Sequence, residues 1–216
     1  MKTIDSCIIL GGGGHARMLI EILTLRGIPI LGILDKNYEL WGTTNQGVPI
    51  LGGDDLLPEL LTQAKWFAIG LGGTGNNRPR QKLFDYALSL GCEPLSIIHP
   101  KAIVSQWTEF GNGSQLLPGC IINVGAVLGK NVIINSGAIV EHDCRIGDHA
   151  HIASGARLAS TVTIGMGAHI GAGATIRQCI NIGSYALVAA GAVVVKDVPD
   201  GKIVAGIPAK PLISQG

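Results

Sequence analysis

The sequence predicts two structural parts within its 216 residues. Residues 1–96 should form a small α/β domain of the Rossmann type, and residues 97–216 an all-β parallel β-helix with a C-terminal tail. Two observations carry this prediction: a six-residue repeat of apolar side chains in the second half, and a glycine-rich turn near the start. The 32 glycines and the 4% share of aromatic residues also favour tight turns around a core of small side chains.

Composition excludes several classes of partner. The formal net charge is only +1, so no basic surface for nucleic acid is indicated. Apolar runs stay far shorter than the roughly 20 residues that span a bilayer, so we expect no membrane insertion. The five cysteines form no CxxC pair and are odd in number, which favours reduced thiols in a cytoplasmic protein.

The repeat places an apolar residue at every sixth position without a slip. These residues are Phe110, Leu116, Ile122, Leu128, Ile134, Val140, Ile146, Ile152, Leu158, Ile164, Ile170, Ile176, Ile182, Val188 and Val194. A small or modest side chain follows four positions later, as at Ala126 and Ala138, and glycine often follows directly, as at Gly129 and Gly147. A period of six fits neither a helix nor an alternating strand.

Such a period fits a triangular solenoid. Each hexad would supply one short strand and one corner, and three hexads would complete a coil. Residues eighteen apart should therefore stack at about the 4.8 Å spacing of neighbouring strands. The fifteen hexads predict five coils.

The first part alternates between strands and helices, which is typical of a parallel sheet covered by helices. The expected strands are 6–10, 28–34 and 65–70, and the expected helices are 16–26, 54–63 and 80–90.

Between the first strand and the first helix, Gly11, Gly13 and Ala16 satisfy the pattern G-x-G-x-x-A, and Asp35 follows the second strand. Glycine lets the backbone approach a diphosphate, the helix N-terminus favours its charge, and the acidic residue would meet a ribose. Only half of a dinucleotide fold is present, so a nucleotide with a single base fits better than NAD. A tight strand-to-helix turn without a ligand would need the same glycines.

The hexads over residues 102–210, ending in Gly206-Ile207-Pro208-Ala209-Lys210, resemble those of the hexapeptide acyltransferases. This resemblance implies a left-handed β-helix, a homotrimer, and acetyl-CoA as cosubstrate between neighbouring solenoids, with no metal required. Joined to an N-terminal G-x-G-G-H-A turn, the repeats resemble the nucleotide-sugar acetyltransferases of bacterial glycan synthesis, including that of lipopolysaccharide. That family comprises the bacillosamine and perosamine N-acetyltransferases and the sialic acid O-acetyltransferase-like proteins.

Carried onto the matching positions, the family resemblance implies a set of residues that hold the nucleotide-sugar. They are Gly13, Gly14, His15, Asp35 and Gly70. The chain departs from the family in two places: Lys36 replaces a second acidic residue, and residues 71–75 interrupt the usual run Ala-Ile-Gly-Asn-Asn. Both departures leave the base and the sugar open.

Val140-Glu141-His142-Asp143-Cys144 falls on one hexad. Val140 and Cys144 take the inward positions, so His142 should lie at a corner or on an outer face. Acetyl transfer needs a base poised near neutral pH, which histidine supplies. An adjacent carboxylate can fix its tautomer, and Asp143 is the first candidate and Glu141 the second. The family motif Glu-His-Asp/Glu-Cys implies the same assignment, whereas an exposed or interfacial histidine would be the alternative.

The family resemblance also implies the acetyl-CoA contacts, which are His151, Ala172 and Ala190. His151 and His169 occupy the same hexad position eighteen residues apart, so their side chains should stack. We expect His169 to be a corner residue without a role in binding.

The sequence therefore predicts an acetyl-CoA-dependent N-acetyltransferase acting on a UDP- or dTDP-linked 4-amino-6-deoxy sugar, with His142 as general base assisted by Asp143. Sugar O-acetylation is an alternative, because the same base serves a hydroxyl. A zinc enzyme like the γ-class carbonic anhydrases, which hold zinc between subunits on three His, is another, since His142, His149, His151 and His169 could offer imidazoles. A non-catalytic nucleotide-sugar-binding protein is the third.

Overall fold

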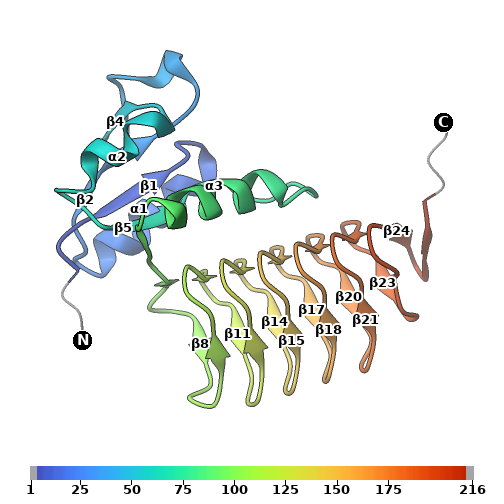
Figure 1. The fold of residues 1–216 in the computed structure, drawn as a ribbon. Coiled ribbons are helices and arrows are strands. Elements are labelled where there is room, and N and C mark those ends of the chain that lie inside the picture. Colours follow the sequence, from blue (N-terminus) through green and yellow to red (C-terminus); the bar gives the residue numbers. More distant parts are fainter. Residues whose placement is uncertain (1–3, 213–216) are drawn as a thin grey trace. The chain divides into compact units, whose positions relative to one another are not determined.

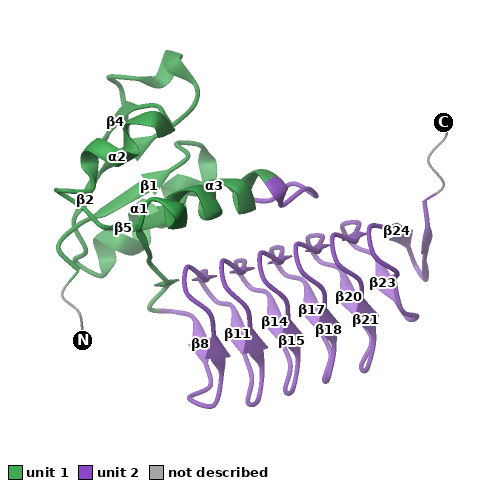
Figure 2. Cartoon of the chain, viewed as in Figure 1, with its two compact units in different colours: residues 1–72, 79–100 green, residues 73–78, 101–216 purple. Residues whose placement is uncertain are grey.

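The computed structural model describes residues 4–212, which form two compact units (Figure 2). Unit 1 extends to Gly72 and resumes over Pro79–Pro100, whereas unit 2 consists of Gly73–Arg78 and the chain from Lys101 onwards. The functional division predicted between residues 96 and 97 stays a prediction. Across residues 4–212, none of the helices has the length and apolar character needed to cross a bilayer.

Unit 1 is an α/β domain whose sheet has the strand order β3-β4-β2-β1-β5-β6 (Figure 1). The strands are β1 (Cys7–Leu10), β2 (Ile30–Leu34), β3 (Thr44–Asn45), β4 (Val48–Gly52), β5 (Trp66–Ile69) and β6 (Glu93–Pro94). The helices are α1 (Gly14–Leu25), α2 (Leu57–Leu60) and α3 (Arg78–Ser89), with 3-10 turns η1 (Tyr38–Leu40) and η2 (Asp54–Leu56). Every pair is parallel except β3 with β4. The predicted α/β domain is confirmed.

Two details of unit 1 differ from the expectations. The helix expected over 54–63 is only the 3-10 turn η2 followed by the one-turn helix α2, because the chain must turn back before β5 starts at Trp66. The β3–β4 hairpin was not expected. Its two-residue turn, Gln46-Gly47, has positive φ at both residues, and a non-glycine residue at φ 48° gives little signal in a sequence.

Unit 2 is the predicted left-handed parallel β-helix, in which two-residue strands stack one coil above another (Figure 1). One sheet contains β8 (Ile103–Val104), β11 (Ile121–Ile122), β14 (Ile139–Val140), β17 (Arg157–Leu158), β20 (Thr175–Ile176) and β23 (Val193–Val194). The second contains β9 (Glu109–Phe110), β12 (Val127–Leu128), β15 (Arg145–Ile146), β18 (Thr163–Ile164) and β21 (Asn181–Ile182). The third contains β10 (Gln115–Leu116), β13 (Ile133–Ile134), β16 (His151–Ile152), β19 (His169–Ile170), β22 (Leu187–Val188), β24 (Ile203–Gly206) and β25 (Ala209–Pro211). The short strand β7 (Ile97–Ile98) precedes them in the chain.

The eighteen-residue stacking holds in these sheets up to the last coil, where Leu187 pairs with Ile203. Ile121 pairs with Ile139, and His151 pairs with His169. The apolar hexad residues from Leu116 to Val194 are at most a few per cent exposed, as predicted. Phe110 is the exception at 37% exposed, because it stands at the first coil of the repeat.

Glycine directly after an apolar hexad residue meets a packing requirement. A Cβ at Gly147 would lie 2.7 Å from the backbone nitrogen of Met166 in the next coil. Because φ at this glycine is not in the left-handed region, the restriction comes from the close approach of two coils and not from a turn conformation.

Candidate active site

The glycine-rich turn joins the carboxyl end of β1 to α1. The N–H of Gly11 donates to the carbonyl of Leu34 at 2.7 Å, which ties the turn to β2. Gly13 is the N-cap of α1, and no side chain caps the helix. Gly13 and Gly14 are exposed, and a Cβ at either would meet no atom within 4 Å. His15, the second residue of α1, is half-buried. The turn therefore leaves open space in front of a helix N-terminus, which suits an anionic group.

The peptide groups of Gly12 are held on both sides. Its N–H donates to Asp35 Oδ2 at 2.5 Å, and its carbonyl accepts from Asn45 Nδ2 at 2.7 Å. The other oxygen of Asp35 accepts from the Asn37 N–H at 2.8 Å. Asp35 thus organises the turn as well as bordering it. Sequence reasoning missed Asn45, because its role depends on the β3–β4 hairpin that brings it there.

Gly70 lies at the end of β5 and is buried. Its N–H donates to the Leu10 carbonyl at 2.7 Å, and a Cβ there would overlap the carbonyl oxygen of Gly11. The carbonyls of Ile69 and Leu71, on either side of Gly70, both accept from Arg80 Nη1 at 2.8 Å. Burial lowers the pKa of Arg80 to about 9, so the guanidinium stays charged at neutral pH. This buried clamp on the strand end was not anticipated from the sequence.

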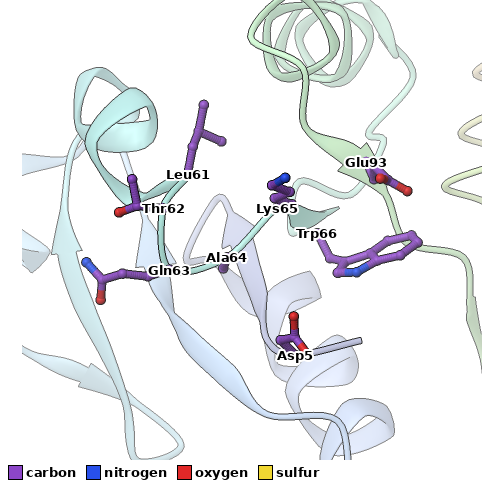
Figure 3. Close-up of a pocket in the computed structure, with 8 residues that line it drawn as sticks. All are labelled: Asp5, Leu61, Thr62, Gln63, Ala64, Lys65, Trp66 and Glu93. Atoms are coloured by element: carbon purple, nitrogen blue, oxygen red, sulfur yellow. The ribbon is translucent and has the colours of Figure 1, made fainter. Parts of the chain in front are cut away.

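A hollow in unit 1 lies at the end of the sheet opposite to the glycine turn (Figure 3). It measures about 500 Å³ and is lined by Asp5, residues 61–66 and Glu93, at the amino ends of β1, β5 and β6. Ligands of parallel sheets bind at the carboxyl ends of the strands. The glycine turn lies at that end of the sheet, because it follows β1.

His142 and Asp143 form a hydrogen-bonded pair on an exposed corner of the solenoid. His142 Nδ1 lies 2.8 Å from Asp143 Oδ2, and the two side chains are 52% and 64% exposed. Because a carboxylate only accepts, Nδ1 carries the proton in this contact and Nε2 of the neutral ring is free to accept one. Val140 and Cys144 are fully buried, so the corner position predicted for His142 is confirmed.

The backbone around the pair explains its geometry. Asp143 adopts φ 60°, and its N–H donates to the Val124 carbonyl of the coil below at 3.1 Å. Gly125, also in the left-handed region, lies under Asp143, and a Cβ there would come within 2.5 Å of Asp143 Oδ1. Glu141 accepts from Asn123 Nδ2 at 2.9 Å. The carboxylate bonded to His142 is therefore that of Asp143.

His151 and His169 stack as expected, with ring centroids 4.8 Å apart and an interplanar angle of 85°. Both begin strands, β16 and β19, so His169 does not stand at a corner. His151 is 4% exposed, and its Nε2 lies 3.2 Å from Asn135 Nδ2. Ala172 and Ala190 are exposed one coil apart, joined by a 2.8 Å bond from the Gly191 N–H to the Ala172 carbonyl.

The stacked pair predicts a pH dependence of stability. Burial lowers the pKa of His169 below its ordinary value, so the fold favours the neutral ring. The free energy of unfolding should be full above about pH 6.5, the unfolded-state pKa, and should fall as the pH drops below it toward the lowered folded-state pKa. Thermal melts between pH 8 and pH 5 should show a smaller loss of Tm in His169→Asn than in the unmodified protein. Identical pH profiles for the two proteins would contradict this.

The imidazoles do not converge on a metal site. His149 Nδ1 lies 2.9 Å from Asn131 Nδ2, and His151 and His169 contact each other. Throughout residues 4–212, no three His, Cys, Asp or Glu side chains are grouped so that they could hold a metal ion.

Both parts of the chain match known families. Residues 6–87 match the PglD N-terminal domain, and residues 125–160 match the bacterial transferase hexapeptide family with six repeats. No curated protein sequence matches the chain.

Several solved structures resemble the chain over almost its whole length. A variant of perosamine N-acetyltransferase from Caulobacter crescentus, in complex with CoA and GDP-perosamine, shares 36% identity and a TM-score of 0.92, covering 98% of this chain and 99% of that one. The acetyltransferase domain of PglB from Neisseria gonorrhoeae, in complex with acetyl coenzyme A, shares 36% identity and a TM-score of 0.88, covering 97% and 100%. WeeI from Acinetobacter baumannii shares 28% identity and a TM-score of 0.83, covering 96% and 99%.

Proposed function

Because this chain belongs to the hexapeptide-repeat nucleotide-sugar acetyltransferases, we propose that it transfers the acetyl group of acetyl-CoA to the amine of a nucleotide-linked 4-amino-6-deoxy sugar. The observation that carries the chemistry is the 2.8 Å contact between His142 Nδ1 and Asp143 Oδ2 on an exposed corner. The base of the nucleotide is uracil, thymine or guanine, the last because the Caulobacter relative binds GDP-perosamine.

His142 acts as the general base. The attacking amine forms a bond to the thioester carbonyl carbon and loses a proton to His142 Nε2, the bond to sulfur breaks, and CoA leaves as the thiol after taking up a proton. Asp143 keeps the proton of the neutral ring on Nδ1 and stabilises the imidazolium that forms. An exposed corner supports this role, because both substrates must reach the base from solvent.

The nucleotide-sugar binds at the glycine turn. Its diphosphate lies against Gly13, Gly14 and His15 at the N-terminus of α1, where open space and backbone N–H groups favour an anion. Asp35 borders the ribose while holding Gly12 in place. Gly70 contributes indirectly, because its lack of a side chain allows the turn and the end of β5 to approach each other closely.

Acetyl-CoA lies along the solenoid wall beside His151, Ala172 and Ala190, where two exposed alanines on successive coils leave room for an extended cosubstrate. The enzyme works as a homotrimer in the cytoplasm, which brings the wall of one solenoid opposite the His142 corner of the next. Size-exclusion chromatography with light scattering measures the assembly directly.

The test of the reaction is incubation of the purified protein with acetyl-CoA and a panel of UDP-, dTDP- and GDP-linked amino sugars. We expect one sugar to gain an acetyl group by mass spectrometry, with stoichiometric release of CoA thiol. The matched control is the same nucleotide-sugar with a hydroxyl in place of the amine. Acetylation of the hydroxyl control and of no amino sugar would overturn N-acetylation in favour of O-acetylation.

A further inference from the structure

The segment Gly73–Arg78, here called the strap, follows β5 in the chain yet belongs to unit 2 with the solenoid (Figure 2). Asn77 Nδ2 donates to the carbonyls of Gly167 and Ala168, both at 3.1 Å. The guanidinium of Arg78 lies 3.9 Å from the centroid of the Tyr185 ring, a cation–π contact. The strap is therefore attached to the solenoid by polar and aromatic contacts at successive residues.

Only one orientation of the Asn77 amide lets its NH₂ group donate, and its Oδ1 has no hydrogen-bond partner among the described residues. The side chain is 1% exposed, and its NH₂ group faces two carbonyls, so Oδ1 must point the other way. On that side lies Gly73. A Cβ at Gly73 would overlap Asn77 Oδ1 and lie 2.7 Å from His151 Nδ1. The amide oxygen of Asn77 and the ring of His151 thus flank the same glycine.

The protonation of His151 follows from its other neighbour. The Ser136 N–H donates to Asn135 Oδ1 at 2.8 Å, which fixes the Asn135 amide with its NH₂ group toward His151 Nε2 at 3.2 Å. Nε2 must therefore accept, and the neutral imidazole carries its proton on Nδ1. This buried N–H lies on the side of the ring where Gly73 and Asn77 Oδ1 are found.

We propose that Asn77 is a positioning residue for acetyl transfer, whose buried amide oxygen lies on the Nδ1 side of His151 and favours the Nδ1–H tautomer through its partial negative charge, although no hydrogen bond joins the two groups in this structure. The inference rests on the proposed function, in which His151 lines the acetyl-CoA site. Bonded to Asn135 and facing the Asn77 oxygen, His151 offers the cosubstrate a neutral ring of fixed orientation. It cannot act as a second base, so His142 remains the proton acceptor of the reaction.

The kinetic test compares Asn77→Ala with Asn76→Ala, because Asn76 is the neighbouring asparagine but is exposed and bonds only to the N–H of Arg78 among the contacts described. We expect Asn77→Ala to lose between about 10- and 100-fold in kcat and in affinity for acetyl-CoA, the usual cost of a misplaced group near the reacting centre. KM for the nucleotide-sugar should stay within about twofold of the unmodified protein. Unchanged kcat and acetyl-CoA affinity in folded Asn77→Ala would overturn the proposal.

The spectroscopic test uses Asn77→Asp, which keeps an oxygen beside His151 and adds a buried negative charge. A carboxylate next to Nδ1 stabilises the imidazolium, so the pKa of His151 should rise. Nitrogen-15 NMR of labelled histidine reports this titration and the tautomer, with His151→Asn identifying the resonance and Asn76→Asp as the exposed control. We expect an Nδ1–H tautomer in the unmodified protein and a raised pKa only in Asn77→Asp. An Nε2–H tautomer, or equal titration in both variants, would overturn the assignment.

The two tests separate the two hypotheses. The NMR measurement needs no substrate, so a protein that acetylates nothing would refute the proposed function while the tautomer still decides the role of Asn77. Conversely, an active enzyme with an Nε2–H tautomer refutes the strap proposal alone. If Asn77→Ala does not fold, the tautomer of His151 in the unmodified protein carries the test, and an Nε2–H tautomer there overturns the proposal.

Discussion

Replacing His142 with alanine is expected to lower kcat for acetyl transfer by about 10²- to 10⁴-fold, the usual contribution of a general base. The side chain is 52% exposed and packs into no core, so Tm should not change. Steady-state kinetics with acetyl-CoA and the amino sugar that accepts the acetyl group measure kcat, and a thermal melt measures Tm. Near-full activity in a folded His142→Ala protein would contradict the assignment.

A matched pair of variants identifies the carboxylate that assists His142. Asp143→Asn removes the negative charge and introduces an NH₂ donor that can bond to unprotonated Nδ1 and so favour the other tautomer, so this variant should lose rate as well. Glu141→Gln removes a charge from the residue next to His142. Because Glu141 bonds to Asn123, the loss of rate in this variant should be smaller than in Asp143→Asn. A larger loss in Glu141→Gln than in Asp143→Asn would assign the role to Glu141.

The solenoid could be predicted from the sequence because its rule is strictly local and periodic. Each coil contributes the same inward positions, so one register decides burial, stacking and the corner on which His142 stands. Even there, the reason for glycine at Gly147 was hidden, since it depends on the backbone of the next coil. Phe110 shows a second limit of the repeat. The pattern does not say at which coil the stack begins, so it does not show that this apolar side chain is exposed.

The contacts that organise the site were beyond the sequence because they join residues far apart in the chain. Asn45 reaches the glycine turn through a hairpin with a weak turn signal, and Arg80 clamps a strand end from the first turn of α3. Asn77 lies about ninety residues before the carbonyls that it contacts. No period or motif marks these side chains, since polar residues in loops are more often solvated than buried.

Two glycine-to-alanine substitutions separate the binding role of the glycine turn from its structural role. In Gly14→Ala, the added methyl meets no atom of the protein within 4 Å, and alanine is the better helix former, so Tm should hold or rise slightly. The methyl would occupy the space that the diphosphate enters. Loss of a charge-assisted hydrogen bond there should raise KM for the nucleotide-sugar by about 10- to 100-fold, while KM for acetyl-CoA stays unchanged.

Gly70→Ala should do the opposite, since its Cβ would overlap the Gly11 carbonyl oxygen and lie 2.8 Å from Ile9 Cγ2. Neither atom belongs to a flexible chain end that could move aside. Forcing the contact should cost about 3 kcal/mol, as overpacking of a dense core does, which lowers Tm by roughly 6–12 °C in a chain of this size. Differential scanning calorimetry and initial-rate kinetics distinguish the two variants. If Gly70→Ala kept its Tm while Gly14→Ala lost stability, the open and crowded sides of the turn would be reversed, and the diphosphate would need another place in unit 1.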